Sequence, residues 1–239
     1  MFQAAALYIV SFIILVQITR LSRRAFISIS YLLFHSKKIG IIIYSMIYLP
    51  GTIIHELSHF FTAAFLGVRT GEISIFPREE EDSRIQLGSV KIAKTDFFRS
   101  SLIGVAPFIV GNILLFYFVS VLGIDITRIG ELLKADMGIQ KSIFLYLTLA
   151  VSNTLFTSKE DRSHWPVLMG FMLVCFIVFW AIGISINIPS SFALKIINVI
   201  NGVAWAVSFS ILINIFIYLV LTTMQKIIEK ITKQKVTYK

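Results

Sequence analysis

The apolar residues of this chain occur in long blocks, and this pattern constrains the fold more than any other feature. Of the 239 residues, 56% are hydrophobic and only 15% are charged, whereas a soluble domain carries about 25% charged residues. A helix needs about 20 apolar residues to cross a bilayer. The sequence therefore predicts a single all-α polytopic membrane domain over 1–239, with about six transmembrane helices. The candidate spans are 2–19, 39–66, 100–123, 142–157, 165–186 and 196–223.

The charge distribution indicates a lipid partner. The formal net charge is +9, which raises the possibility of a nucleic-acid partner. The Lys and Arg residues, however, lie mainly in the gaps between the apolar blocks and in the C-terminal stretch 225–239. Basic residues beside membrane spans usually meet anionic lipid headgroups. We therefore expect membrane lipid and no nucleic acid as a partner, and an integral, multi-pass membrane protein.

The gap at 67–96 differs from the other gaps. It contains GEISIF and RIQLGSVKIAK, two stretches that alternate polar and apolar residues, on either side of the charged PREEEDS. Such alternation is typical of half-buried strands joined by a loop. We expect a small β element at the membrane surface. The alternative is a plain solvated loop.

A second unusual feature is TIIHELSHFF, residues 52–61, which places ionisable side chains inside an apolar block. On a helix, His55 and His59 lie on one face and can present two imidazole nitrogens to one ion. Glu56 lies about 100° further around the helix. There it can take a proton from an attacking water, as the HExxH motif of zinc proteases requires. Ionisable residues at membrane depth are costly, so a functional role is favoured over a self-satisfied polar cluster.

A catalytic zinc site needs three protein ligands and one open position. Asp161 is the only carboxylate among the candidates for the third ligand at membrane depth, and the adjacent Glu160 competes with it. By chemistry alone, Asp161 is either a ligand or a surface charge. The full set of candidates is Asn112, Asn153, Asp161, Asn198, Asn201 and Asn214.

These residues resemble the motifs of the site-2 protease family of intramembrane zinc metalloproteases. The likeness rests on His55-Glu56-Leu57-Ser58-His59 and on the eight-residue step from Asn153 to Asp161. It implies a catalytic core at 39–165, made of the HExxH helix, surface strands, a third span and an Asp-bearing span, followed at 165–239 by two further spans and a basic tail. It also implies one Zn²⁺ per chain. The implied roles are metal ligand for His55, His59 and Asp161, catalytic base for Glu56, and substrate binding for Asn153 and Asn112.

The chain departs from the family pattern at three points. Arg162 follows Asp161 where the family has Gly, and the prolines of the preceding turn are absent. In the middle span Asn112 comes five positions after Pro107, rather than three. The expected function is hydrolysis of peptide bonds in membrane-spanning substrates. The alternatives are a metal-ion transporter and an inactive, protease-like membrane binding protein.

Overall fold

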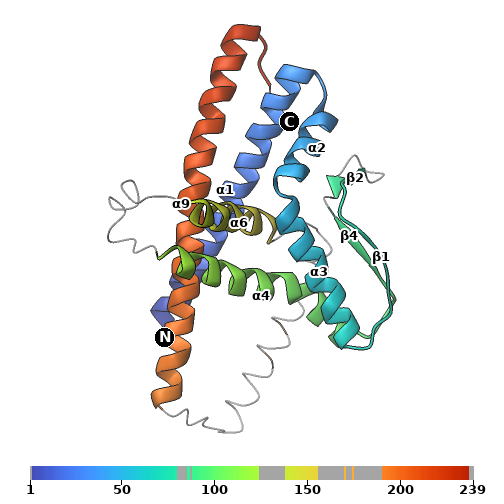
Figure 1. The fold of residues 1–239 in the computed structure, drawn as a ribbon, viewed down its shortest axis with the longest axis vertical. Coiled ribbons are helices and arrows are strands. Elements are labelled where there is room, and N and C mark those ends of the chain that lie inside the picture. Colours follow the sequence, from blue (N-terminus) through green and yellow to red (C-terminus); the bar gives the residue numbers. More distant parts are fainter. Residues whose placement is uncertain are drawn as a thin grey trace.

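The computed structural model describes residues 2–79, 85–86, 88–123, 138–155, 170, 174 and 190–236. The described part is mostly helical, with short strands between the third and fourth helices (Figure 1). The helices are α1 (Phe2–Phe34), α2 (Lys37–Ile47), α3 (Leu49–Phe65), α4 (Phe97–Leu122), α6 (Ile139–Thr154) and α9 (Ser190–Thr232). The strands are β1 (Thr70–Ser74), β2 (Arg78–Glu79), β3 (Ile85–Gln86) and β4 (Ser89–Ile92).

The prediction of about six spans is too high for the described residues. Within them, two helices have the length and hydropathy to cross a membrane, Phe97–Leu122 and Leu194–Thr232. A third candidate arises if α2 and α3 count as one broken span, since they meet at a bend of 73°. The predicted span 142–157 corresponds to α6, which has 16 residues and is short for a bilayer. The predicted span 165–186 lies outside the described residues, apart from 170 and 174.

The bend between α2 and α3 follows from the sequence. Pro50 lies in the first turn of α3, where its missing N–H is not needed by that helix. The same Pro cannot donate to a carbonyl four residues earlier, so α2 cannot continue through it. Tyr48 lies between the two helices, outside both. The apolar block 39–66 therefore gives a single hydropathy peak but forms two helices.

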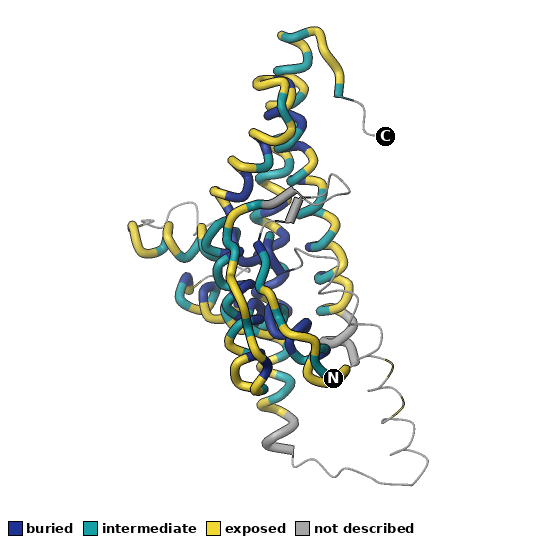
Figure 2. Tube along the Cα trace, turned by 90° about the vertical axis from the view of Figure 1, so that its right-hand side faces the viewer, coloured by how far each residue is buried: buried dark blue, intermediate teal, exposed yellow. Residues whose placement is uncertain are grey.

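The helices form two crossing layers. In Figure 1, α1 and α9 lie side by side, and α4 and α6 cross them. Leu15, Leu115, Val151 and Val207 are each at most 2% exposed and bring all four helices into one core. Figure 2 shows buried positions gathered around this crossing, while exposed positions run along the outer faces. Large apolar side chains on those faces, such as Phe216 of α9 at 68% exposure, are suited to lipid.

The predicted small β element after the HExxH helix is confirmed. Helix α3 ends at Phe65, and two residues later comes Gly67, whose φ of 69° is left-handed. Val68 then donates its N–H to the carbonyl of Ala63 at 2.9 Å, and Gly67 to that of Ala64 at 3.1 Å, which is the Schellman pattern. The chain thereby reverses into β1, which pairs with β4 in antiparallel register, Ser74 opposite Ser89. Figure 1 shows this ribbon running back along α3. Strands β2 and β3 form a second antiparallel pair.

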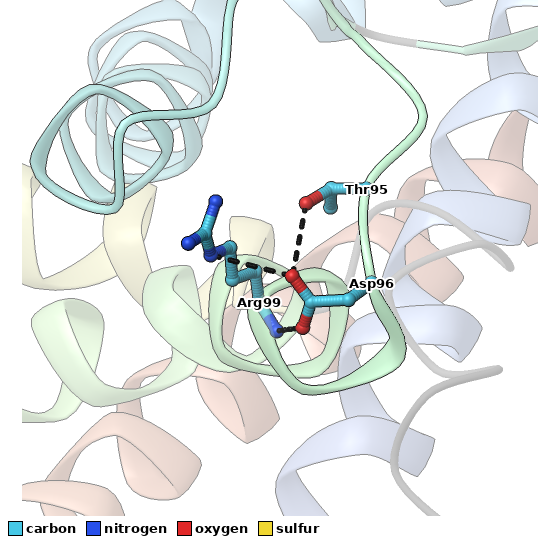
Figure 3. Close-up of polar contacts among 3 residues, drawn as sticks. All are labelled: Thr95, Asp96 and Arg99. Carbon is cyan, nitrogen blue, oxygen red and sulfur yellow. Dashed lines mark hydrogen bonds and ion pairs between the residues drawn. The ribbon is translucent and has the colours of Figure 1, made fainter.

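Asp96 fixes the start of α4 (Figure 3). Its Oδ1 accepts the main-chain N–H of Arg99 at 3.0 Å, and its Oδ2 accepts the Thr95 hydroxyl at 3.4 Å. The Arg99 side chain returns to Oδ2 at 3.3 Å. An Asp in this position satisfies one of the N–H groups that a helix leaves unpaired at its beginning. The cap sets where α4 begins, and so sets the position of Ile103 along the helix.

Candidate functional site

The three polar residues of the HExxH motif, which are two predicted metal ligands and the predicted base, lie on the inward face of α3. His55, Glu56 and His59 are 3%, 4% and 7% exposed. Thr52 and Ser58 are buried on the same helix, whereas Phe65 is 90% exposed. The polar residues therefore face protein, and an apolar residue faces outward. This is the arrangement expected for a helix in lipid, because a charged or polar group in contact with acyl chains is costly.

The two histidines of the motif are neighbours. Their ring centroids lie 5.0 Å apart, with the ring planes at 79°. This arises because residues four apart are adjacent on a helix surface. The pair is thus compatible with a shared ion.

His59 is oriented by α4. Its Nδ1 lies 2.9 Å from the carbonyl oxygen of Ile103. A carbonyl can only accept, so Nδ1 carries the proton and Nε2 carries the lone pair in the neutral ring. The helical partner of the Ile103 carbonyl would be the N–H of residue 107, which is Pro107 and has none. The proline inside α4 therefore leaves this carbonyl available to His59.

Helix α3 approaches α6 closely at Gly51. A Cβ added there would lie 2.3 Å from the carbonyl oxygen of Ala150 and 2.5 Å from Oγ1 of Thr154. Only a glycine permits this approach. His55 lies one turn further along α3, so the contact positions the motif relative to the end of α6.

The hairpin formed by β1 and β4 packs against the site at Gly88, just before β4. A Cβ added to this buried residue would lie 2.7 Å from Oε1 of Glu56 and 2.8 Å from Cγ2 of Thr52. The main chain of the hairpin therefore lies directly against the carboxylate. Sequence reasoning did not identify Gly88, although a glycine inside a strand pattern often signals such a close approach.

The two predicted substrate-binding asparagines form hydrogen bonds within the fold. Asn153 of α6 donates from Nδ2 to Oδ1 of Asn214 on α9 at 2.8 Å, and its Oδ1 accepts from the Tyr44 hydroxyl at 3.5 Å. Asn112 of α4 accepts from the hydroxyl of Tyr8 at 2.9 Å. Both side chains thus link helices. Their role toward a substrate stays a prediction.

Asp161, the predicted third ligand, and its competitor Glu160 lie outside the described residues. Within the described ranges, no group of three or more His, Cys, Asp or Glu side chains could hold a metal ion. The last described residue of this region is Leu155, one position after the Thr154 that contacts Gly51. The described part of the site therefore contains two of the three predicted zinc ligands, His55 and His59.

Comparisons of the chain with protein-family models, with curated proteins and with solved structures find no match.

Proposed function

We propose that this chain is an intramembrane zinc metalloprotease of the site-2 protease type, which hydrolyses peptide bonds of membrane-spanning substrates in a prokaryotic cell membrane. The observation that carries the proposal is the geometry of α3. His55, Glu56 and His59 are buried together, and His59 is held in one tautomer by Ile103. A buried His-Glu-His face of this kind is costly at membrane depth unless it serves a purpose.

The histidines suit zinc. Protein zinc sites use neutral imidazoles, whose second ring nitrogen usually donates to a carbonyl or carboxylate. The bond from Nδ1 of His59 to the Ile103 carbonyl supplies that interaction, and we assign Nε2 as the ligand atom. We assign His55, His59 and Asp161 as the three protein ligands. When bound, zinc supplies Lewis acidity, which makes a water more acidic and polarises a peptide carbonyl.

Glu56 is the proposed base. It lies on α3 next to His55, and the main chain at Gly88 packs against its carboxylate. This packing limits the positions open to the side chain. Glu56 accepts the proton of the attacking water and passes it to the leaving amine.

The hairpin is the proposed docking edge for substrate. A helical substrate shields its carbonyls, so it must be extended before it is cleaved. Strands β1 and β4 pair only with each other in the described sheet, and an open strand edge can accept an extended peptide by β-augmentation. Deletion of 72–92 should abolish cleavage and leave zinc bound. Cleavage that survives the deletion would exclude the hairpin from substrate docking.

The decisive experiment compares the wild type with Glu56→Gln. Both proteins are purified in detergent, zinc per chain is measured, and each is incubated with labelled single-span substrates. The proposal expects about one zinc in both, because Glu56 is not a ligand, and cleavage only by the wild type. Asp161→Asn should lower the zinc content, because a carboxamide oxygen is a weaker ligand than a carboxylate.

The same experiment separates the alternatives. Zinc bound by both proteins with cleavage by neither, together with zinc flux into liposomes, would identify a metal-ion transporter. Zinc binding with neither cleavage nor flux would identify an inactive binding protein. Absence of zinc from both would contradict the assignment of the three ligands.

A further inference from the structure

A cavity of about 50 Å³ lies between α1, α2 and the C-terminal end of α6, and none of its lining residues belongs to α3. A cavity needs only about 15 Å³ to hold one water, so this one has room for a larger group. Its walls combine both polar and apolar side chains. They are Phe12, Leu15, Val16, Thr19, Arg20, Arg23, Tyr44, Ser152, Asn153 and Leu155.

Two arginines make one end of the cavity positively charged. Arg20 and Arg23 lie three residues apart, on the same face of α1, and both are partly buried. The ion pairs recorded between described residues are Lys91 with Glu72 and Arg99 with Asp96. Within the described chain, therefore, no carboxylate neutralises Arg20 or Arg23. Two cations at one partly buried site attract an anion, and the more strongly because water is scarce there.

The cavity is also amphipathic along α1. Thr19, Arg20 and Arg23 form one end, and Phe12, Leu15 and Val16 lie one to two turns earlier on the same helix. On the same part of α1, Ile9 and Ile13 expose 56% and 55% of their surface. An anionic group at the arginines would thus have an apolar surface directly beside it. A phospholipid has this combination of an anionic phosphate and an acyl chain.

We propose that this cavity binds the phosphate headgroup of an anionic phospholipid, with the acyl chains along the apolar face of α1. The planar guanidinium groups of Arg20 and Arg23 each match two phosphate oxygens. The Asn153 amide is at the wall of the same cavity, so the bound headgroup lies beside the polar link from Asn153 to Asn214. The proposal does not depend on proteolysis, because each of its tests measures binding.

The test titrates the purified full chain in a zwitterionic detergent with dioleoylphosphatidylglycerol and follows bound lipid by native mass spectrometry. The double variant Arg20→Gln/Arg23→Gln should bind this lipid about tenfold or more weakly, since charge-assisted hydrogen bonds to phosphate are lost. The matched control is Lys37→Gln/Lys38→Gln. It removes the same charge from exposed residues of α2 and should bind as the wild type does.

Two further probes identify the ligand. Dioleoylphosphatidylcholine should bind more weakly than phosphatidylglycerol, because it carries no net negative charge. Inorganic phosphate should not displace phosphatidylglycerol at millimolar concentration. Equal binding of the two lipids would overturn the proposal that the site selects an anionic headgroup. Displacement by inorganic phosphate would overturn the proposal that the ligand is a lipid.

A charge-preserving variant covers the case in which the glutamine variant does not fold. Arg20→Lys/Arg23→Lys keeps both charges but loses the planar donor geometry. Its affinity for phosphatidylglycerol should lie between those of the wild type and the glutamine variant. If the glutamine variant does not fold, the affinity of the lysine variant should still be lower than that of the wild type. Wild-type affinity in whichever arginine variant folds would overturn the proposal.

Discussion

His59 of α3 is joined to Ile103 of α4 by a hydrogen bond of 2.9 Å from the imidazole Nδ1 to the main-chain carbonyl oxygen. The residues are 44 positions apart in sequence. Pro107 has no N–H to offer to that carbonyl, which leaves the carbonyl available to His59. A proline inside one helix thereby sets the tautomer of a histidine on another.

Pro107→Ala tests this relationship. The new N–H competes with His59 for the Ile103 carbonyl, and loss of such an outer contact typically weakens metal binding about 10- to 100-fold. Alanine also favours the helix, by about 3 kcal/mol in a helix interior. Zinc affinity, measured by chelator competition, should fall while the melting temperature does not. If zinc affinity stayed at the wild-type level, Pro107 would have no part in orienting His59.

Under the proposed function, Gly88→Ala should impair substrate cleavage more than zinc binding. The new Cβ would lie 2.7 Å from Oε1 of Glu56, so the carboxylate or the hairpin must move. A displacement of about 1 Å in a catalytic group can cost about 100-fold in rate. The measurement is substrate cleavage together with zinc content. Gly71→Ala is the control on the same hairpin, where the added Cβ would lie 3.2 Å from Cβ of Lys91 and no atom of Glu56 is among its nearest neighbours. Equal rates for the two variants would contradict the packing of Gly88 on Glu56.

Gly51→Ala should destabilise the contact between α3 and α6. The added methyl meets the main-chain carbonyl of Ala150 at 2.3 Å, and a main chain cannot move aside as a side chain can. Overpacking of this kind costs about 1–3 kcal/mol, which thermal unfolding in detergent would detect. Gly138→Ala is the control, because nothing lies within 4 Å of the added Cβ there. The Gly51 variant should melt at the lower temperature.

Asp96→Ala should lower stability in a pH-dependent way. The hydrogen bond from the Arg99 main chain, followed by its guanidinium charge, holds the pKa of Asp96 below its ordinary value of 3.8. Because the pKa of Asp96 is lower in the folded state than in the unfolded state, the ionised carboxylate stabilises the fold at pH values above the unfolded-state pKa. This stabilisation is lost as the pH falls through the folded-state pKa. The difference in melting temperature between wild type and variant should therefore be largest near pH 7 and shrink below about pH 4. A constant difference would show that the charge of Asp96 is not involved.

Asn214→Ala should weaken the link between α6 and α9. Asn214 is fully buried; it accepts from Asn153 at 2.8 Å and donates to Ser152 at 3.1 Å. Hydrogen bonds between membrane helices contribute about 1 kcal/mol each, so the melting temperature in detergent should fall. Asn201→Ala, at an exposed position of the same helix, should melt close to the wild type.

The local features of this protein were predictable from its sequence. The apolar blocks predict helices near 100–123 and 196–223, and the structure has α4 and α9 there. Alternation in 67–96 predicts the strands. The spacing of His55 and His59 predicts their adjacency. All of these depend on periods and breaks within a few residues, which a sequence displays directly.

The number of spans was less predictable, because a hydropathy average over a window does not show whether the helix bends within that window. The block 39–66 meets the length for a span, yet it contains a bend of 73°. The contacts that complete the site were not predictable at all. Gly88 meets Glu56 because Gly67 reverses the chain and the pairing of β1 with β4 sets how far the hairpin returns. His59 meets Ile103 because the Asp96 cap and Pro107 set which carbonyl of α4 is available. The sequence alone determined which residues are candidates for the proposed chemistry, since that depends on side-chain type and local spacing. Only the tertiary structure decided what surrounds them, since packing depends on residues distant in the chain.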